Sequence, residues 1–153
     1  NPMSYDINEC DEDYIFNIEI EFNITPTATN SIIRLDAMVN GEWNPWTSAY
    51  NSVWFFYRGS TKLSGPAAGN RDVGVLMGTA ITIESANAGS TPEQAYYSYF
   101  DTPSTTSQVT YKVGVRQGVG SALTWYHNRT LYDSDGVQYE RGTSFISATE
   151  IAG

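Results

Sequence analysis

Apolar and polar residues alternate over several stretches of the chain, and this pattern predicts β-strands. In residues 14–24 the side chains at even positions are apolar and those at odd positions are mostly polar. A repeat of two residues is typical of a strand that buries one of its faces. The other segments that we interpret as strands are 31–40, 53–58, 73–85, 95–101, 108–116, 122–131 and 143–151.

The middle of the chain departs from this alternation. Residues 53–58 form a short and nearly continuous apolar run, which suits a strand covered on both faces. The pair Asn40-Gly41 is a strong turn signal, so we expect residues 42–52 to form a loop or a short edge. Residues 59–72 contain Gly and Pro at four positions and predict a long loop.

These segments together predict an all-β fold. About eight to ten short strands, joined by turns rich in Gly, Pro, Asn and Ser, indicate an antiparallel sandwich, and we expect a jelly roll. The chain shows no internal repeat or linker, so we expect a single domain over residues 1–153, with 1–13 as an acidic lead-in segment.

Composition supports this fold and limits the function. Aromatic residues make up 14% and charged residues only 16% of the chain, and Thr and Ser are plentiful, which argues against a helical bundle. The formal net charge of −9 argues against binding to nucleic acid or an anionic membrane. No segment approaches the roughly 20 apolar residues that span a bilayer, so we expect no membrane insertion.

Candidate catalytic chemistry is sparse. The single cysteine, Cys10, lies in an acidic run that disfavours a thiolate, and it cannot form a disulfide within the chain. The single histidine, His127, lies in a predicted strand, and we interpret it as a structural residue that makes a local hydrogen bond. No nucleophile elbow, zinc motif or phosphate loop is present. We therefore predict no catalytic residue and no enzyme activity.

Aromatic residues between polar ones suggest a ligand site in residues 42–52. Trp43, Trp46 and Tyr50 offer flat rings that can stack on sugars, beside Asn and Ser side chains that can bond sugar hydroxyls. The alternative is that these rings plug one end of the sandwich or join a subunit contact.

A surplus of aromatic residues also suggests a subunit interface. Tyr96, Tyr97 and Tyr99 cannot all lie on one side of a strand, so one face is expected to pack on a neighbouring copy. In the last strand Phe145 and Ile146 stand beside small polar residues, and we expect this strand near a threefold axis. The alternative is that both sheets are covered within the monomer.

A turn near the C-terminus raises the question of a cation. Asp133, Asp135 and Glu140 surround this turn and could offer oxygen atoms to Ca²⁺. A calcium loop needs five or more ligands at set spacing, and this turn is short of that number. We therefore interpret it as a turn stabilised by Asp side chains, and predict no metal and no cofactor.

Several blocks, taken in their order along the chain, resemble the C-terminal head domains of bacteriophage tail-fibre and other virion-surface proteins, especially those of marine phages. The resemblance covers most of the chain from about residue 13 and is strongest in the terminal block. The blocks are 20–27, 31–35, 98–103, 110–115, 128–130 and 141–151. The acidic N-terminus and the aromatic segment around Trp43 and Trp46 depart from the family.

The resemblance implies a fold, an assembly and a role. The expected fold is a jelly roll like that of tumour necrosis factor and the complement head, assembled as a homotrimer at the tip of a fibre or spike. We expect exposure on the virion, contacts with other virion proteins, and attachment to a glycan or protein receptor on the host cell. The alternative is a structural protein that decorates the capsid, and a polysaccharide depolymerase is the third reading.

Overall fold

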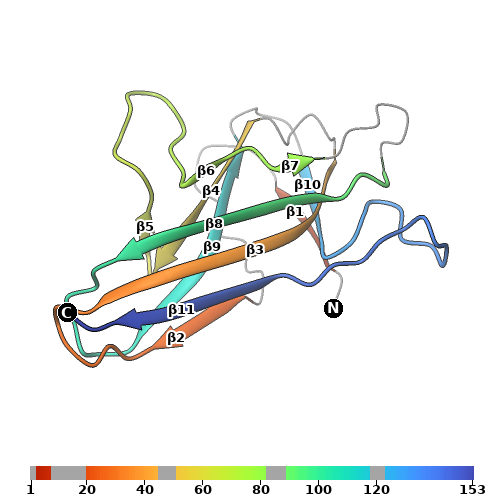
Figure 1. Ribbon diagram of the computed structural model, residues 1–153. Coiled ribbons are helices and arrows are strands. Elements are labelled where there is room, and N and C mark those ends of the chain that lie inside the picture. Colours follow the sequence, from red (N-terminus) through yellow and green to blue (C-terminus); the bar gives the residue numbers. More distant parts are fainter. Residues whose placement is uncertain (1–2, 8–19, 45–50, 82–88, 118–122) are drawn as a thin grey trace.

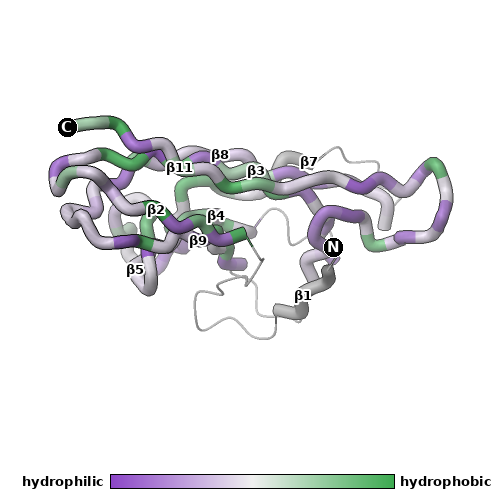
Figure 2. The backbone as a smooth tube through the Cα atoms, turned by 90° about the horizontal axis from the view of Figure 1, so that it is seen from below, coloured by the Kyte–Doolittle hydropathy of each residue, from purple (hydrophilic) through white to green (hydrophobic). Residues whose placement is uncertain are grey.

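The chain folds into two stacked antiparallel sheets. The computed structural model describes residues 3–7, 20–44, 51–81, 89–117 and 123–153. Figure 1 shows the long strands β11, β3 and β8 side by side, and Figure 2 shows the second sheet as a separate layer below them. The described residues form strands, turns and loops and no α-helix, which confirms the all-β prediction.

The larger sheet has six strands and is centred on β3, which is 13 residues long. One edge of β3 pairs with β10 and then with β11, and its other edge pairs with β8. The outermost strands are β1 beside β10 and β7 beside β8. The six strands are β1 (Met3–Ile7), β3 (Ile32–Asn44), β7 (Ala80–Ile81), β8 (Glu93–Asp101), β10 (Leu123–His127) and β11 (Phe145–Ile151).

The smaller sheet has five strands, in the order β2, β9, β4, β5, with β6 paired to the end of β4. Its centre is formed by β4 and β9, which pair over seven positions. The five strands are β2 (Glu21–Ile24), β4 (Ser52–Arg58), β5 (Thr61–Leu63), β6 (Leu76–Met77) and β9 (Val109–Gln117).

Three tryptophans fill the core at one end of the sandwich. Trp43 of β3 and Trp125 of β10 come from the larger sheet, and their ring centroids lie 5.2 Å apart. Trp54 of β4 comes from the smaller sheet and lies 5.3 Å from Trp125 and 6.4 Å from Trp43. All three rings are fully buried, so this cluster joins the two sheets through apolar contact.

Polar contacts join the sheets nearer the other end. The carboxylate of Asp101, on β8, accepts hydrogen bonds from Arg58 at 2.9 Å and from the Tyr111 hydroxyl at 2.7 Å. Both donors belong to the smaller sheet, on β4 and β9. Burial, followed by the hydrogen bond to Asp101, raises the pKa of Tyr111, so its hydroxyl stays protonated and remains a donor.

Strand β4 is covered on both faces, as its apolar run predicts. Trp54 and Phe56 point into the main core, while Val53, Phe55 and Tyr57 form a second buried cluster on the opposite face. Phe55 and Tyr57 meet edge to face at 5.4 Å. A Cβ on Gly114 of β9 would collide with the Phe55 ring, so the glycine provides the space for this second layer.

The predicted turn at Asn40-Gly41 is wrong, because β3 continues through Gly41 to Asn44. The Gly41 backbone pairs with Glu93 on one side and with His127 on the other. A Cβ at Gly41 would collide with the Trp125 ring and the Tyr126 carbonyl. The glycine therefore lets Trp125 pack against the strand, and its role is close packing rather than a turn.

Two other segments are more ordered than their composition indicates. Met3–Ile7, within the expected lead-in segment, forms β1 and pairs antiparallel with β10. Thr61–Leu63, within the expected long loop, forms β5 and pairs with β4. Short strands of three to five residues carry too little alternation to be recognised from sequence.

Candidate functional site

The larger sheet presents an outer face with large apolar side chains. Tyr96, Phe100 and Phe145 are 56%, 60% and 41% exposed, although aromatic side chains are usually buried. They lie on β8 and β11, and Ile32 and Met38 lie on β3 between these strands. We call this surface the outer apolar face, and its apolar members are Ile32, Met38, Tyr96, Phe100, Phe145 and Ile151.

Strand register groups these side chains into rows. Met38 pairs with Phe145 on one side and Tyr96 on the other, so the three form one row across the sheet. Ile32 and Ile151 pair six residue pairs further along and form a second apolar row near the C-terminus. The outer apolar face therefore extends across three strands and is apolar at both ends.

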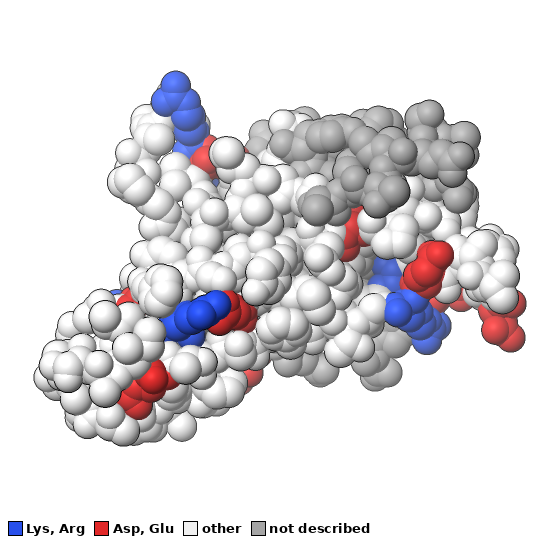
Figure 3. Space-filling model, viewed as in Figure 1, with Lys and Arg blue, Asp and Glu red and all other residues white. Residues whose placement is uncertain are grey.

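The centre of this face carries one internal ion pair. Arg34 and Asp36 lie 3.0 Å apart on β3, and Asp36 also accepts a hydrogen bond from Ser98 at 2.6 Å. The hydrogen bond from Ser98 is the largest cause that lowers the pKa of Asp36, so this group stays ionised opposite Arg34. The face thus carries no net charge on a chain of net charge −9, and Figure 3 shows it largely uncharged over β3, β8 and β11.

The predicted interface residues divide between the two faces of the sheet. Tyr96 and Phe145 belong to the outer apolar face. Tyr97 is only 5% exposed and lies in the core, and Tyr99 and Ile146 are partly buried and pack against that core. These three therefore do not belong to the outer apolar face. The sequence analysis did not predict the other members of this face, which are Met38, Phe100, Ile32 and Ile151. Their alternation with core residues along each strand was the signal that could have identified them.

Of the residues predicted to bind a ligand, the structure describes only Trp43. Trp43 is 1% exposed within the tryptophan cluster, so it cannot stack on a sugar at the surface. The ligand prediction is wrong for Trp43, because β3 extends beyond Gly41 and places this residue on its inner side, where the ring fills one end of the sandwich as the alternative expected. Trp46 and Tyr50 lie outside the described residues, as does Cys10.

Two glutamates are buried at the tryptophan end of the sandwich. Glu93 accepts hydrogen bonds from the Trp43 amide at 3.0 Å and from the Thr79 hydroxyl at 2.8 Å. Burial raises its pKa to about 7, and the nearby Glu42 adds to this rise. Glu42 accepts bonds from the amides of Gly89, Thr91 and Leu131, and burial raises its pKa as well.

These carboxylates accept hydrogen bonds from the backbone of neighbouring segments. Glu42 links the segment that precedes β8 to the loop that follows β10, because it accepts hydrogen bonds from backbone amides of both.

His127 is buried, and burial lowers its pKa to about 4, so the imidazole is neutral at pH 7. Its Nδ1 atom has no hydrogen-bond partner among the described residues, so the predicted local hydrogen bond is not found at this atom.

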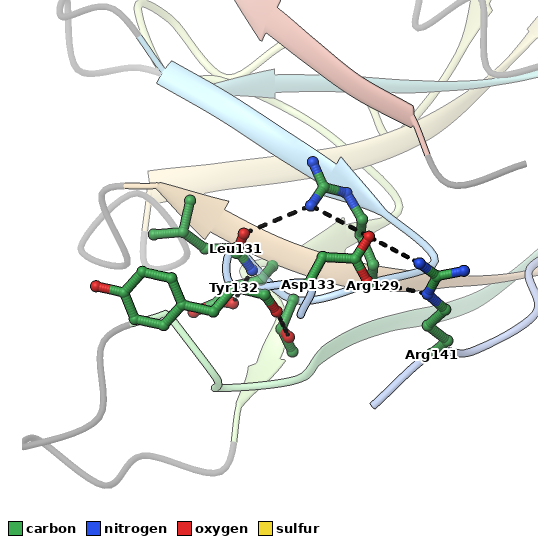
Figure 4. A network of polar contacts seen from close by, with 7 residues as sticks. Arg129, Leu131, Tyr132, Asp133 and Arg141 are labelled. Carbon is green, nitrogen blue, oxygen red and sulfur yellow. Dashed lines mark hydrogen bonds and ion pairs between the residues drawn. The ribbon is translucent and has the colours of Figure 1, made fainter. Parts of the chain in front are cut away.

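The loop between β10 and β11 contains a second cluster of charges, shown in Figure 4. Asp133 lies 2.9 Å from Arg141 and 3.7 Å from Arg129, and the hydrogen bond from Arg141 is the main cause that lowers its pKa. Arg129 also donates to the Leu131 carbonyl at 3.4 Å. Asp133, predicted to stabilise a turn, is thus held between two arginines. Among the described residues no group of three or more His, Cys, Asp or Glu side chains could hold a metal ion.

Comparisons with family models and with curated proteins give no relative from which a function can be transferred. The chain matches no model of a known protein family, and a search of curated proteins finds no significant match. Within the part of the chain that the structure describes, no helix is long and apolar enough to cross a membrane.

Proposed function

We propose that this chain is a non-enzymatic head domain of a virion-surface fibre or spike, with a jelly-roll topology, that assembles as a homotrimer and attaches the particle to its host cell. The observation that carries the proposal is the outer apolar face. The ordered resemblance of the sequence to phage head domains supports the viral role and the threefold symmetry.

The chemistry of the outer apolar face favours a second copy of this chain as its partner. Its charged groups, Arg34 and Asp36, already pair with each other, so this face adds no net charge to a contact between acidic copies. Aromatic residues and methionine are enriched in subunit interfaces. The aliphatic side chains of Ile32 and Ile151 at one end fit a protein partner better than a sugar, which stacks on aromatic rings.

The buried carboxylates support a binding role over catalysis. Glu42 accepts hydrogen bonds from three backbone amides, and Glu93 accepts one from a backbone amide and one from a hydroxyl. Each carboxylate is therefore engaged in structural hydrogen bonds. Asp36, Asp101 and Asp133 each pair with arginine. The described acidic groups thus have structural partners where they are buried, which suits a scaffold that presents surfaces.

The position of the protein in the virus particle tests this role. An antibody against the chain is used to label virus particles from the source of the sequence, and the label is located by electron microscopy. Labelling at the tips of fibres or spikes is expected. Labelling spread over the capsid would replace attachment with decoration, and release of reducing ends from host polysaccharide by the purified chain would overturn the non-enzymatic reading.

A further inference from the structure

The loop between β10 and β11 projects at one end of the larger sheet, and it borders two hollows. The larger, about 520 Å³, lies within the curve of the loop. The smaller, about 120 Å³, lies between the loop, residues 40–41 of β3 and the start of β8. Arg141 lines both hollows and stands between them. Figure 3 shows charged side chains of both signs gathered at this end of the molecule.

The base of the loop is fixed before any ligand arrives. Asn128 adopts the left-handed conformation at φ 60° and turns the chain out of β10. Its amide donates to the Asn40 carbonyl at 2.8 Å, and its carbonyl accepts from the Gly142 amide at 3.0 Å. The Glu42 carboxylate accepts a hydrogen bond from the Leu131 amide, and the Tyr132 amide donates to the Gly89 carbonyl at 2.8 Å. A preformed site of this kind loses less entropy on binding.

The larger hollow combines an aromatic ring with charged and hydroxyl groups. Tyr139 lines it and is held edge to face against Tyr132, with the ring centroids 6.3 Å apart. Arg141 is exposed enough to reach a ligand while its guanidinium contacts Asp133. Asp135 makes no ion pair with any other described residue. The full lining is Asp133, Ser134, Asp135, Gly136, Tyr139 and Arg141.

The smaller hollow continues the same chemistry. Its polar lining residues include Asn40, Asn128, Arg129 and Glu140. Residues that can donate and residues that can accept hydrogen bonds therefore line both hollows that Arg141 borders. Acidic groups balance or exceed the two arginines, so neither hollow is suited to an anion.

We propose that the two hollows form a binding site for a neutral oligosaccharide. Sugar hydroxyls both donate and accept hydrogen bonds, which matches a lining of carboxylates, amides, hydroxyls and guanidinium groups. The ring of Tyr139 supplies the apolar surface on which one sugar residue stacks. Arg141 lies between two sugar residues and bonds hydroxyls of both. The biological role rests on the proposed attachment function, and the site would be a receptor-glycan contact.

Calorimetry with defined oligosaccharides tests this site. The purified chain is titrated with the neutral trisaccharides maltotriose, cellotriose, mannotriose and xylotriose, and with a sialylated trisaccharide. We expect binding of at least one neutral probe. Asp135→Ala is expected to weaken it about tenfold, the effect of one charge-assisted hydrogen bond, without changing the unfolding temperature. Arg141→Gln is expected to weaken binding further.

Val137→Ser is the matched control, since Val137 is exposed on the same loop and lines neither hollow. It should bind like the unchanged protein. Absence of binding to all neutral probes, binding of the sialylated probe alone, or binding that survives both Asp135→Ala and Arg141→Gln would overturn the inference. The oligomer mass is measured on the same samples: a trimer that binds no sugar refutes this site only, and a monomer that binds sugar refutes the trimer only.

Discussion

The Tyr97 hydroxyl of β8 donates a hydrogen bond to the Phe55 carbonyl of β4, 2.9 Å away, and so connects the two sheets. Its neighbour Tyr96 points in the opposite direction, to the outer apolar face. The substitution Tyr97→Phe removes one buried hydrogen bond and is expected to lower the free energy of unfolding by about 1 kcal/mol.

Tyr96→Phe is the matched control for this change, and its effect on the free energy of unfolding should be close to zero. Both variants are measured by urea denaturation at a concentration at which the oligomeric state is unchanged. Equal losses in the two variants would show that the hydroxyl of Tyr97 does not stabilise the contact between the sheets.

Gly41 is expected to tolerate no side chain. Gly41→Ala places a methyl group against the Trp125 ring and the Tyr126 carbonyl, and should cost about 1–3 kcal/mol of stability because the core is overfilled. Gly65→Ala is the control, since its Cβ would meet only Val73 at 3.3 Å and a carbonyl at 3.8 Å. Thermal unfolding of both variants checks this. A Gly41→Ala protein as stable as Gly65→Ala would contradict the close packing of Trp125.

Glu93 should make stability depend on pH. Its pKa rises from the ordinary 4.5 to about 7 in the folded protein, chiefly because the carboxyl group is buried. The folded state therefore holds the proton more tightly than the unfolded state. The resulting stability is fully present below about pH 4.5 and is lost as the pH rises through about 7, by roughly 3 kcal/mol in total.

Glu93→Gln should remove this pH dependence, because glutamine does not ionise. The difference in unfolding free energy between the variant and the unchanged protein is measured by urea denaturation at pH 5 and pH 8, and it should shift in favour of the variant at pH 8. His127 and other titrating groups are common to both proteins and cancel in the difference. Parallel curves for the two proteins would contradict the raised pKa of Glu93.

Much of the fold followed from alternation. The strands at 95–101, 108–116 and 143–151 are observed close to their predicted limits, and Phe145, Ser147, Thr149 and Ile151 do share one face. The apolar run at 53–58 was also interpreted correctly, because a strand buried on both faces has no polar side to alternate with.

The predictions that failed depended on distant contacts. The sequence around Gly41 indicates a turn. The true reason for the glycine is that the ring of Trp125, from a strand over 80 positions later, occupies the space where a Cβ would lie. Tyr96 and Tyr97 are chemically identical, and only the register with β3 shows which one faces outward. The Arg129–Asp133–Arg141 cluster has a short spacing, but the smaller hollow beside it forms only where the loop meets β3 and β8.

The mass of the protein in solution tests the central claim, self-association through the outer apolar face. Sedimentation equilibrium should show a trimer for the unchanged chain. Phe100→Glu should dissociate it to a monomer, because it removes an aromatic contact and gives the face of each copy one net negative charge, since Arg34, the register partner of position 100, is already paired with Asp36. Val137→Glu adds the same charge outside this face and should remain a trimer. A monomer at all concentrations, or a trimer that survives Phe100→Glu, would contradict the account.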